Sequence, residues 1–330
     1  MDASASTSAR PGYLVWLALF ALAGYGVFLA RHAAVQPGGS DSSGYFNTAR
    51  LLAHGTVQAP MRALDGLPGT ALPEYAYVPL GFRPDATQTR LVPTYPIGLP
   101  LFLLAAIRTV GPAHGPDLLL IAHALAGIWL MYALARTMGC GRPAASLGAA
   151  LLAFSPLYLM YALHAMSDLP ALVWVTAAIW LAWQSPRSNW LALAAGFALG
   201  VAVLLRPTNL LAMVPISLAL GAAPRRWAGL VLGGLPCAVG LGVFNHAAYG
   251  SAFASGYTDV ADLLSPRWVP VTLGHYARWL PVVASPLVLA ALGLPWLWPR
   301  ARRTVLVLGS WIVVWFGFYA CYFHTHEYWW

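Results

Sequence analysis

Long stretches without a charged residue constrain this chain more than any other feature of its sequence. A helix crosses a bilayer core of about 30 Å with roughly 17 to 25 apolar residues. Uncharged stretches of about this length recur at 13–30, 118–135, 143–163, 169–184, 189–205, 207–224, 227–245, 279–298 and 304–323. The sequence therefore predicts an all-α membrane protein, a multi-span helix bundle with about nine spans.

The composition excludes the other broad classes of protein. Of the 330 residues, 59% are apolar and only 8% are charged, whereas a soluble domain has about 25% charged residues. A soluble globular enzyme needs more polar surface than this, and a disordered chain has fewer apolar residues. The three cysteines are scattered and predict neither a disulfide framework nor a zinc site. No basic run is mixed with aromatic residues on a polar face, so a nucleic-acid partner is not expected.

The arginines predict the orientation of the spans, because basic residues favour the cytoplasmic side. The apolar segment 93–110 admits two topologies, since three prolines crowd its start. If it does not cross the membrane, one set of arginines shares the cytoplasmic side: Arg10, Arg136, Arg142, Arg187, Arg225, Arg226, Arg300, Arg302 and Arg303. We therefore predict that 93–110 is a membrane-surface or re-entrant helix and that the N-terminus is cytoplasmic. The first stretch could be a signal peptide, but its length favours an uncleaved anchor.

Residues 31–117 then form a long outer loop, periplasmic in a bacterial inner membrane, that contains surface helices. The run 40–55 predicts a capped helix, and 56–92, rich in Pro, Gly and Thr, is expected to be irregular. In this topology every acidic residue except Asp2 falls on the outer side, so the outer face is expected to carry the titratable chemistry.

Two carboxylates are the main catalytic candidates. Asp41 is either a helix cap or a general base at the membrane–water boundary. Asp168 lies between two apolar runs, where a carboxylate is costly and suggests a functional site. The alternative is again a cap, because Pro170 follows closely.

Basic side chains supply the candidates for binding a phosphate. Arg206 follows an apolar run, where it could be a snorkelling anchor or a clamp for phosphate oxygens. Arg50 and Tyr45 are weaker candidates for the same role. The ending His324-Thr-His326-Glu327 could supply a metal ligand, which gives a tentative set of Asp41, Asp168 and His326 for a divalent ion. Interface histidines are commoner than ligands, so no cofactor is certain.

Several short motifs occur in a recognisable order. They are Asp41-Ser-Ser-Gly-Tyr45, Pro93-Thr-Tyr95-Pro96, Phe154-Ser155-Pro156, Met166-Ser-Asp168-Leu-Pro170, Arg206-Pro207-Thr208, and Asn245 followed by Tyr249-Gly250 and Gly256-Tyr257. Their order and spacing resemble the integral-membrane glycosyltransferases of class C, which use polyprenyl-phosphate sugars as donors. That superfamily includes the protein O-mannosyltransferases and the aminoarabinose transferases that modify lipid A.

The resemblance implies one transmembrane domain over 1–330, with surface helices in the first outer loop and the site at the outer face. It implies that Asp41 activates the acceptor, that Asp168 is a second carboxylate of the site, that Arg206 lies near the donor phosphate, and that the anomeric centre is inverted. Ser42 follows Asp41 where protein O-mannosyltransferases carry a second acid, which argues against that subclass. Members also continue past the ninth span, so we expect the natural product to be longer.

The expected function is transfer of a sugar from a polyprenyl-phosphate donor to a lipid, glycan or protein acceptor of the cell envelope. One alternative is a transporter or flippase for a lipid-linked sugar, and another is a non-catalytic assembly partner. A transporter would place ionisable groups near the bilayer midplane, often in paired repeats. The carboxylates here are predicted at the outer edge and no repeat is visible, which favours the enzyme.

Overall fold

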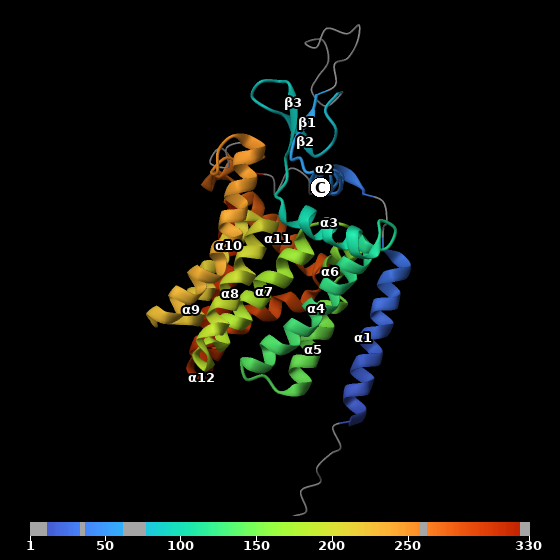
Figure 1. Ribbon diagram of the computed structural model, residues 1–330. Coiled ribbons are helices and arrows are strands. Elements are labelled where there is room, and N and C mark those ends of the chain that lie inside the picture. The colour runs from blue at the N-terminus through green and yellow to red at the C-terminus, as the bar shows by residue number, and fades with distance from the viewer. Residues whose placement is uncertain (1–11, 34–36, 62–76, 258–262, 324–330) are drawn as a thin grey trace, which may run out of the picture.

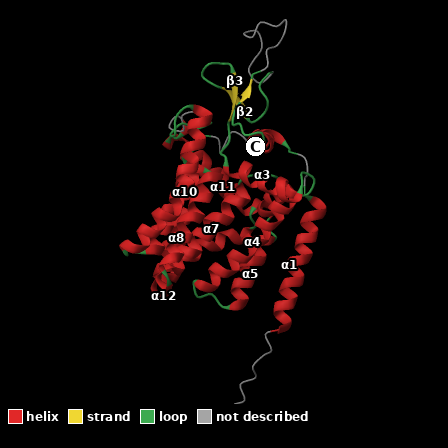
Figure 2. Ribbon diagram, viewed as in Figure 1, coloured by secondary structure: helices red, strands yellow, loops and turns green. Residues whose placement is uncertain are grey.

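The computed structural model describes residues 12–33, 37–61, 77–257 and 263–323, and these are almost entirely helical (Figures 1 and 2). The α-helices are α1 Gly12–His32, α2 Gly39–Ala53, α3 Gly98–Val110, α4 Gly115–Thr137, α5 Arg142–Ala153, α6 Pro156–Leu163, α7 Asp168–Gln184, α8 Asn189–Leu205, α9 Met213–Leu220, α10 Pro224–Tyr249, α11 Val269–Val283 and α12 Trp298–Ala320. The 3-10 helices include η3 Pro207–Ala212 and η6 Pro286–Leu297. The predicted all-α class is confirmed.

Fewer helices of the structure are long and apolar enough to cross a membrane than the nine spans that the sequence predicts. Within the described residues, three helical stretches are long and apolar enough to cross a membrane: Gly115–Thr137, Pro224–Tyr249 and Pro286–Ala320. The bent pair α5 and α6 raises the number to four if it counts as one span. Shorter apolar helices occupy several of the other predicted segments, so the nine-span count stays a prediction.

Two predicted spans are interrupted. The segment 143–163 is two helices that meet at 58°, and the second begins at Pro156. The segment 279–298 is broken after α11, where Ser285 has a φ of 86° and η6 begins at Pro286. Proline lacks the amide proton that a continuing helix needs and favours a first helical turn instead. In each of these two segments the chain changes direction, and the uniform apolar composition does not indicate it.

Small side chains allow α8 and α10 to pack closely against each other. Gly196 on α8 lies against the backbone of Leu230, and further along Gly200 lies against Cys237, so the two helices run parallel. Gly233 on α10 lies in the same way against the backbone of Leu193. A Cβ at Gly196 or Gly233 would collide with a backbone carbonyl. Such contacts between small residues are a common basis of helix association in membranes.

Helix α3 begins and ends at the same end of the bundle. Its first residue, Gly98, contacts the backbone of Leu204 and Leu205 at the end of α8. At its other end, α4 begins with Gly115, which packs on the backbone of Ala106. Figure 1 shows α3 at the same end as α2 and the strands. Segment 93–110 thus returns to the end from which it starts, as a surface or re-entrant helix would.

A small antiparallel sheet replaces part of the irregular loop expected over 56–92. Its strands are β1 Ala59–Pro60, β2 Phe82–Pro84 and β3 Arg90–Pro93, in the order β1-β3-β2. Asp85 shapes the turn between β2 and β3, because its carboxylate accepts from the Thr87 hydroxyl and from the Thr89 and Arg90 amides. These bonds, that of the Thr87 hydroxyl first, lower the pKa of Asp85. The expectation of an irregular segment is therefore wrong where these strands lie.

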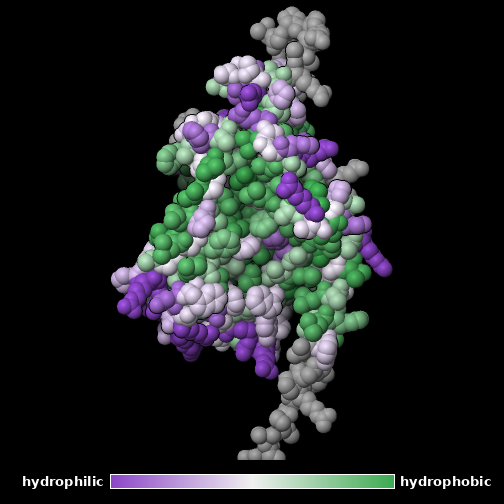
Figure 3. All heavy atoms as spheres, in the orientation of Figure 1, coloured by the Kyte–Doolittle hydropathy of each residue, from purple (hydrophilic) through white to green (hydrophobic). Residues whose placement is uncertain are grey.

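The two ends of the molecule differ in charge. On the face shown in Figure 3, hydrophilic residues gather at both ends and mostly hydrophobic residues lie between them. At one end, Arg303 donates to the carbonyls of Trp183 and Ala219, and Arg226 donates to that of Leu220. The carboxylates within the described residues, Asp41, Asp85, Asp117 and Asp168, lie on elements of the opposite end.

Candidate functional site

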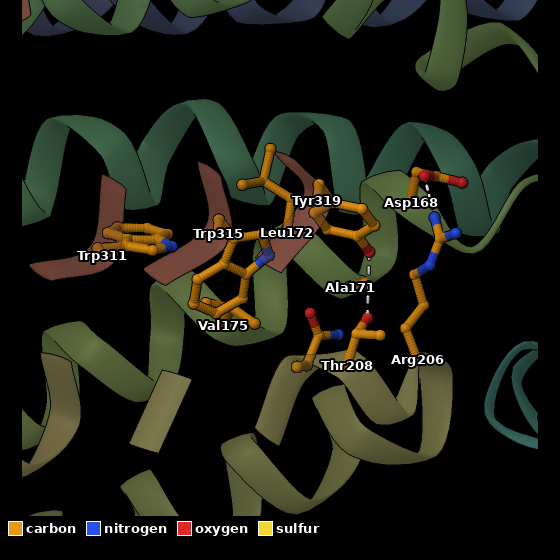
Figure 4. Close-up of a pocket in the computed structure, with 10 residues that line it drawn as sticks. Asp168, Ala171, Leu172, Val175, Arg206, Thr208, Trp311, Trp315 and Tyr319 are labelled. Carbon is orange, nitrogen blue, oxygen red and sulfur yellow. Dashed lines mark hydrogen bonds and ion pairs between the residues drawn. The ribbon is translucent and has the colours of Figure 1, made fainter. Parts of the chain in front are cut away.

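An ion pair between two helix ends forms the centre of the candidate site. Asp168 is the first residue of α7, and Arg206 follows the last residue of α8. These helices are antiparallel and joined by a short connection, so both residues lie at the same end. A guanidinium nitrogen of Arg206 contacts a carboxylate oxygen of Asp168, and the side chains are 35% and 26% exposed (Figure 4). The pair is thus only partly open to solvent.

The ion pair lies at the edge of a pocket of about 290 Å³. The lining residues are Asp168, Ala171, Leu172, Val175, Arg206, Thr208, Asn209, Trp311, Trp315 and Tyr319. Figure 4 shows the three aromatic residues of α12 in a row, with Tyr319 nearest to the ion pair. The hydroxyls of Thr208 and Tyr319 are 3.3 Å apart. The pocket therefore has a charged, polar end and an apolar, aromatic end.

Asp41 lies in the first turn of α2 and is not among the residues that line the pocket. The neighbouring Tyr45 hydroxyl hydrogen-bonds Ser167 Oγ, which directly precedes Asp168, over 2.9 Å. Burial raises the pKa of Tyr45, while the charges of Arg206, Asp41 and Asp168 all act on it as well. Three charged residues separated in sequence therefore converge around one tyrosine hydroxyl.

Neither carboxylate caps its own helix through its side chain. The residue before α2 is Gly38, and the residue before α7 is Ser167; neither makes a side-chain capping bond. Asp168 interacts with Arg206 across two helices instead of with the backbone of α7. The capping alternative thus has no support from the hydrogen bonds of these helix ends.

A cluster of tyrosines lies near the first turn of α2, which carries the half-buried Asp41. Tyr95 donates to Ser40 Oγ over 2.9 Å, and its ring centroid lies 5.4 Å from that of Tyr45 and 6.3 Å from that of Tyr257. Burial, followed by smaller effects that include the Asp41 carboxylate, raises the pKa of Tyr95 to about 12. Tyr95 is therefore neutral at physiological pH and can donate a hydrogen bond at this site.

Close backbone contact holds this part of α2 in place. Gly44 on α2 and Gly81, which has a φ of 84°, touch through their backbones. A Cβ on Gly44 would also come within 2.6 Å of the Tyr95 ring. Only glycine at both positions lets the loop before β2 lie directly on the helix that carries Asp41.

The other predicted site residues lie elsewhere. Arg50 is exposed near the end of α2 and does not line the pocket, and Tyr45 is buried beside the pocket rather than in its lining. His326 lies outside the described residues. The prediction also omitted the aromatic row Trp311, Trp315 and Tyr319. Its spacing of four residues is a helical pattern that the sequence does display.

The described residues hold only part of the predicted metal-ligand set, because His326 lies outside them. A hard cation such as Mg²⁺ takes several oxygen ligands. The described residues contain no group of three or more His, Cys, Asp or Glu side chains that could hold a metal. Asp168 is already paired with a guanidinium, whose positive charge opposes a second cation beside it. The tentative metal set therefore stays a prediction without structural support among these residues.

Comparison with known families agrees with the resemblance seen in the motifs. Residues 103–246 match the family model described as dolichyl-phosphate-mannose-protein mannosyltransferase. This match is consistent with the class C glycosyltransferase superfamily. It spans less than half of the chain and includes Asp168 and Arg206, whereas Asp41 precedes it. No curated protein and no solved structure matches the chain.

The family match bears on the activity and the location of the protein. It points to a glycosyltransferase of the kind that uses a polyprenyl-phosphate sugar as donor. Together with the apolar helices, it indicates an integral membrane protein. The family description names mannose and a protein acceptor, whereas Ser42 after Asp41 departs from the paired acids expected of protein O-mannosyltransferases.

Proposed function

We propose that the protein transfers a sugar from a polyprenyl-phosphate donor to an acceptor of the cell envelope, at the periplasmic face of a bacterial inner membrane. One observation carries this proposal: Arg206 lies at the polar end of a pocket whose other end is apolar and aromatic. A polyprenyl phosphate has the same division between an anionic head and an apolar chain. The partly buried Asp168 and the nearby Asp41 then supply the carboxylates that the chemistry needs.

The donor phosphate is assigned to Arg206 and the first part of the lipid to the aromatic end of the pocket. Guanidinium carries five N–H donors in a planar fork, so an Arg206 that contacts Asp168 keeps donors for phosphate oxygens. Along α7 the lining runs from Asp168 to Val175, seven residues or about 10 Å of helix. This length matches a phosphate with the first isoprene units behind it.

The transfer proceeds by direct displacement at the anomeric carbon. The acceptor hydroxyl forms a bond to that carbon while the bond to the phosphate oxygen breaks, and attack from the opposite face inverts the centre. Asp41 accepts the hydroxyl proton, a contribution of about 10²- to 10⁴-fold. Arg206 stabilises the negative charge on the departing phosphate, and Asp168 holds the guanidinium in place.

The proposal includes a multi-pass topology with a cytoplasmic N-terminus. Helix α7 and the shorter apolar helices Trp16–His32, Asn189–Leu205 and Pro207–Leu220 are assigned as further spans. Small deficits in length can be met by local thinning of the bilayer. The arginine-rich end is then cytoplasmic and the Asp168 end periplasmic, in accord with the bias of basic residues toward the cytoplasm.

The test uses the purified protein in liposomes with radiolabelled polyprenyl-phosphate sugars and cell-envelope fractions as acceptors. We expect label to move to the envelope fraction with the wild type and not with Arg206→Ala. Movement of labelled donor across the bilayer without transfer would support a flippase instead. Repeating the assay with a chelator tests the predicted divalent ion, and fractionating the acceptors into lipid, glycan and protein identifies the acceptor class.

A further inference from the structure

A buried hydrogen bond joins the helix that carries Asp41 to the helix that carries Asp168. The Tyr45 hydroxyl and Ser167 Oγ are 2.9 Å apart. Tyr45 is 2% exposed and Ser167 is 1% exposed. A bond between two side chains that water does not reach is costly to break, because each hydroxyl would lose its partner without gaining a water molecule.

The position of this bond relates it to both carboxylates. Tyr45 follows Asp41 by four residues, which is about one turn of α2, so the two side chains share a face of the helix. Ser167 immediately precedes Asp168. Any movement of α2 relative to the start of α7 would therefore change the distance between the carboxylates and strain this hydrogen bond first.

The surroundings of Tyr45 prevent its ring from taking other positions. The ring belongs to a buried cluster with Leu99 and Leu103 of α3 and with Ala171 of α7. Its centroid also lies 5.4 Å from that of Tyr95, which donates to Ser40 next to Asp41. Rings packed at this density change position little. The hydroxyl is thus directed at Ser167, and Tyr45 is not among the residues that line the pocket.

We propose that Tyr45 and Ser167 form a positioning pair, which fixes Asp41 at its working distance from the Asp168–Arg206 ion pair. This role takes the place of the phosphate contact that the sequence predicts for Tyr45. It rests on the proposed function, because the spacing matters only if Asp41 and Arg206 act on the same substrate. Displacement of a catalytic group by about 1 Å can reduce a rate by about 10²-fold.

The kinetic test removes the two hydroxyls separately and together. Tyr45→Phe and Ser167→Ala should each lower kcat by about 10- to 100-fold and change the donor KM by less than about twofold, since Arg206 is untouched. The double variant should be no slower than the slower single variant, because both changes break one bond. Three results would overturn the proposal: a rise in the donor KM as large as the fall in kcat, a fall in kcat of the double variant equal to the product of the two single falls, or an unchanged kcat.

Tyr158→Phe is the matched control. Tyr158 is 5% exposed, and its hydroxyl donates to the Ala124 carbonyl over 2.6 Å, in α6 and α4 and away from the carboxylates. This variant also loses one buried hydroxyl and should lose similar thermal stability. It should retain kcat, and a loss of kcat equal to that of Tyr45→Phe would identify a general effect of lost stability and contradict the positioning role.

A distance measurement tests the positioning role without any activity. Spin labels at Ala53→Cys on α2 and His164→Cys before α7, in a background without the native cysteines, report the separation of the two segments. We expect a narrow distance distribution, which Tyr45→Phe and Ser167→Ala broaden and Tyr158→Phe does not. An unchanged distribution in both site variants would refute the pair. Broadening in a protein that transfers no sugar would instead refute the proposed function alone.

Discussion

At the scale of single residues, the structure changes the interpretation of the Asp168 side chain. The sequence left it between a helix cap and a functional carboxylate, and the structure pairs it with Arg206 across α7 and α8. Removing one member of a partly buried pair leaves the other charge without compensation. The ion pair therefore couples the position of the phosphate-binding candidate to that of one carboxylate.

Arg206→Lys tests the shape of this contact as well as its charge. Lysine keeps the positive charge but loses the planar fork that binds two oxygens at once. We expect the KM for the polyprenyl-phosphate donor to rise by at least about tenfold, while the KM for the acceptor changes much less. Steady-state kinetics with each substrate varied in turn measure both constants. Arg187→Lys, an exposed arginine at the other end of α7, is the control and should change neither.

The sequence points to the charged residues of the candidate site because charge is rare in this chain. Asp41, Asp168 and Arg206 stand out against apolar surroundings, where each has a high cost. Ser167, Trp311 and Tyr319 do not stand out, since serine, tryptophan and tyrosine are ordinary in membrane proteins. Their contribution depends on which helices are neighbours, and local sequence does not carry that information.

At the scale of elements, the contact between α8 and α10 depends on glycine. The backbones approach so closely at Gly196 and Gly233 that any side chain there meets a carbonyl of the partner helix. Arg206 follows α8 directly. The same contact that stabilises the bundle thus fixes the position of the candidate phosphate-binding residue.

Gly196→Ala should destabilise the protein although alanine is the better helix former. Its Cβ would collide with the Leu230 carbonyl, and overpacking of this kind costs about 1–3 kcal/mol. Gly240→Ala on α10 is the control, because a Cβ there meets nothing within 4 Å and alanine favours the helix by about 1 kcal/mol. Thermal unfolding in detergent should give a lower midpoint for the first variant and an equal or higher one for the second. A midpoint for Gly196→Ala at or above that of the wild type would contradict this packing.

The elements themselves were predicted unevenly, for a physical reason. Hydropathy located the helices well, since burial in lipid requires long apolar runs. It did not reveal the break at Ser285 or the bend before Pro156, because an apolar run has the same composition whether it is straight or bent. The sheet was missed because β1 has two residues and pairs with β3 about 30 positions later, which leaves no local alternation to detect.

At the scale of the whole molecule, one end carries the described carboxylates, and the other carries Arg187 after α7, Arg226 in the first turn of α10 and Arg303 near the start of α12. Helix α3 does not change this division, because it starts and finishes at the carboxylate end. The described fold therefore agrees with a chain in which 93–110 does not cross the membrane.

Reporter fusions test this topology. A reporter active only in the periplasm should give signal at residue 85, and one active only in the cytoplasm should give signal at residue 302. A fusion at residue 114, after α3, should behave as the fusion at residue 85 does. Cytoplasmic signal at residue 114 together with periplasmic signal at residue 85 would show that 93–110 crosses, and it would reverse every later span.

The central claim is that Asp41 is the general base of a site shared with Asp168 and Arg206, and Asp41→Asn tests it most directly. The amide has nearly the same size but cannot accept the proton, and Gly38 rather than Asp41 occupies the cap position of α2. Sugar transfer should fall by at least about 10²-fold, with donor binding and thermal stability unchanged. Asp117→Asn, which changes an acid in the first turn of α4 at the same end of the molecule, should keep full activity. Near-normal transfer by Asp41→Asn would contradict the account and leave the proton to another residue.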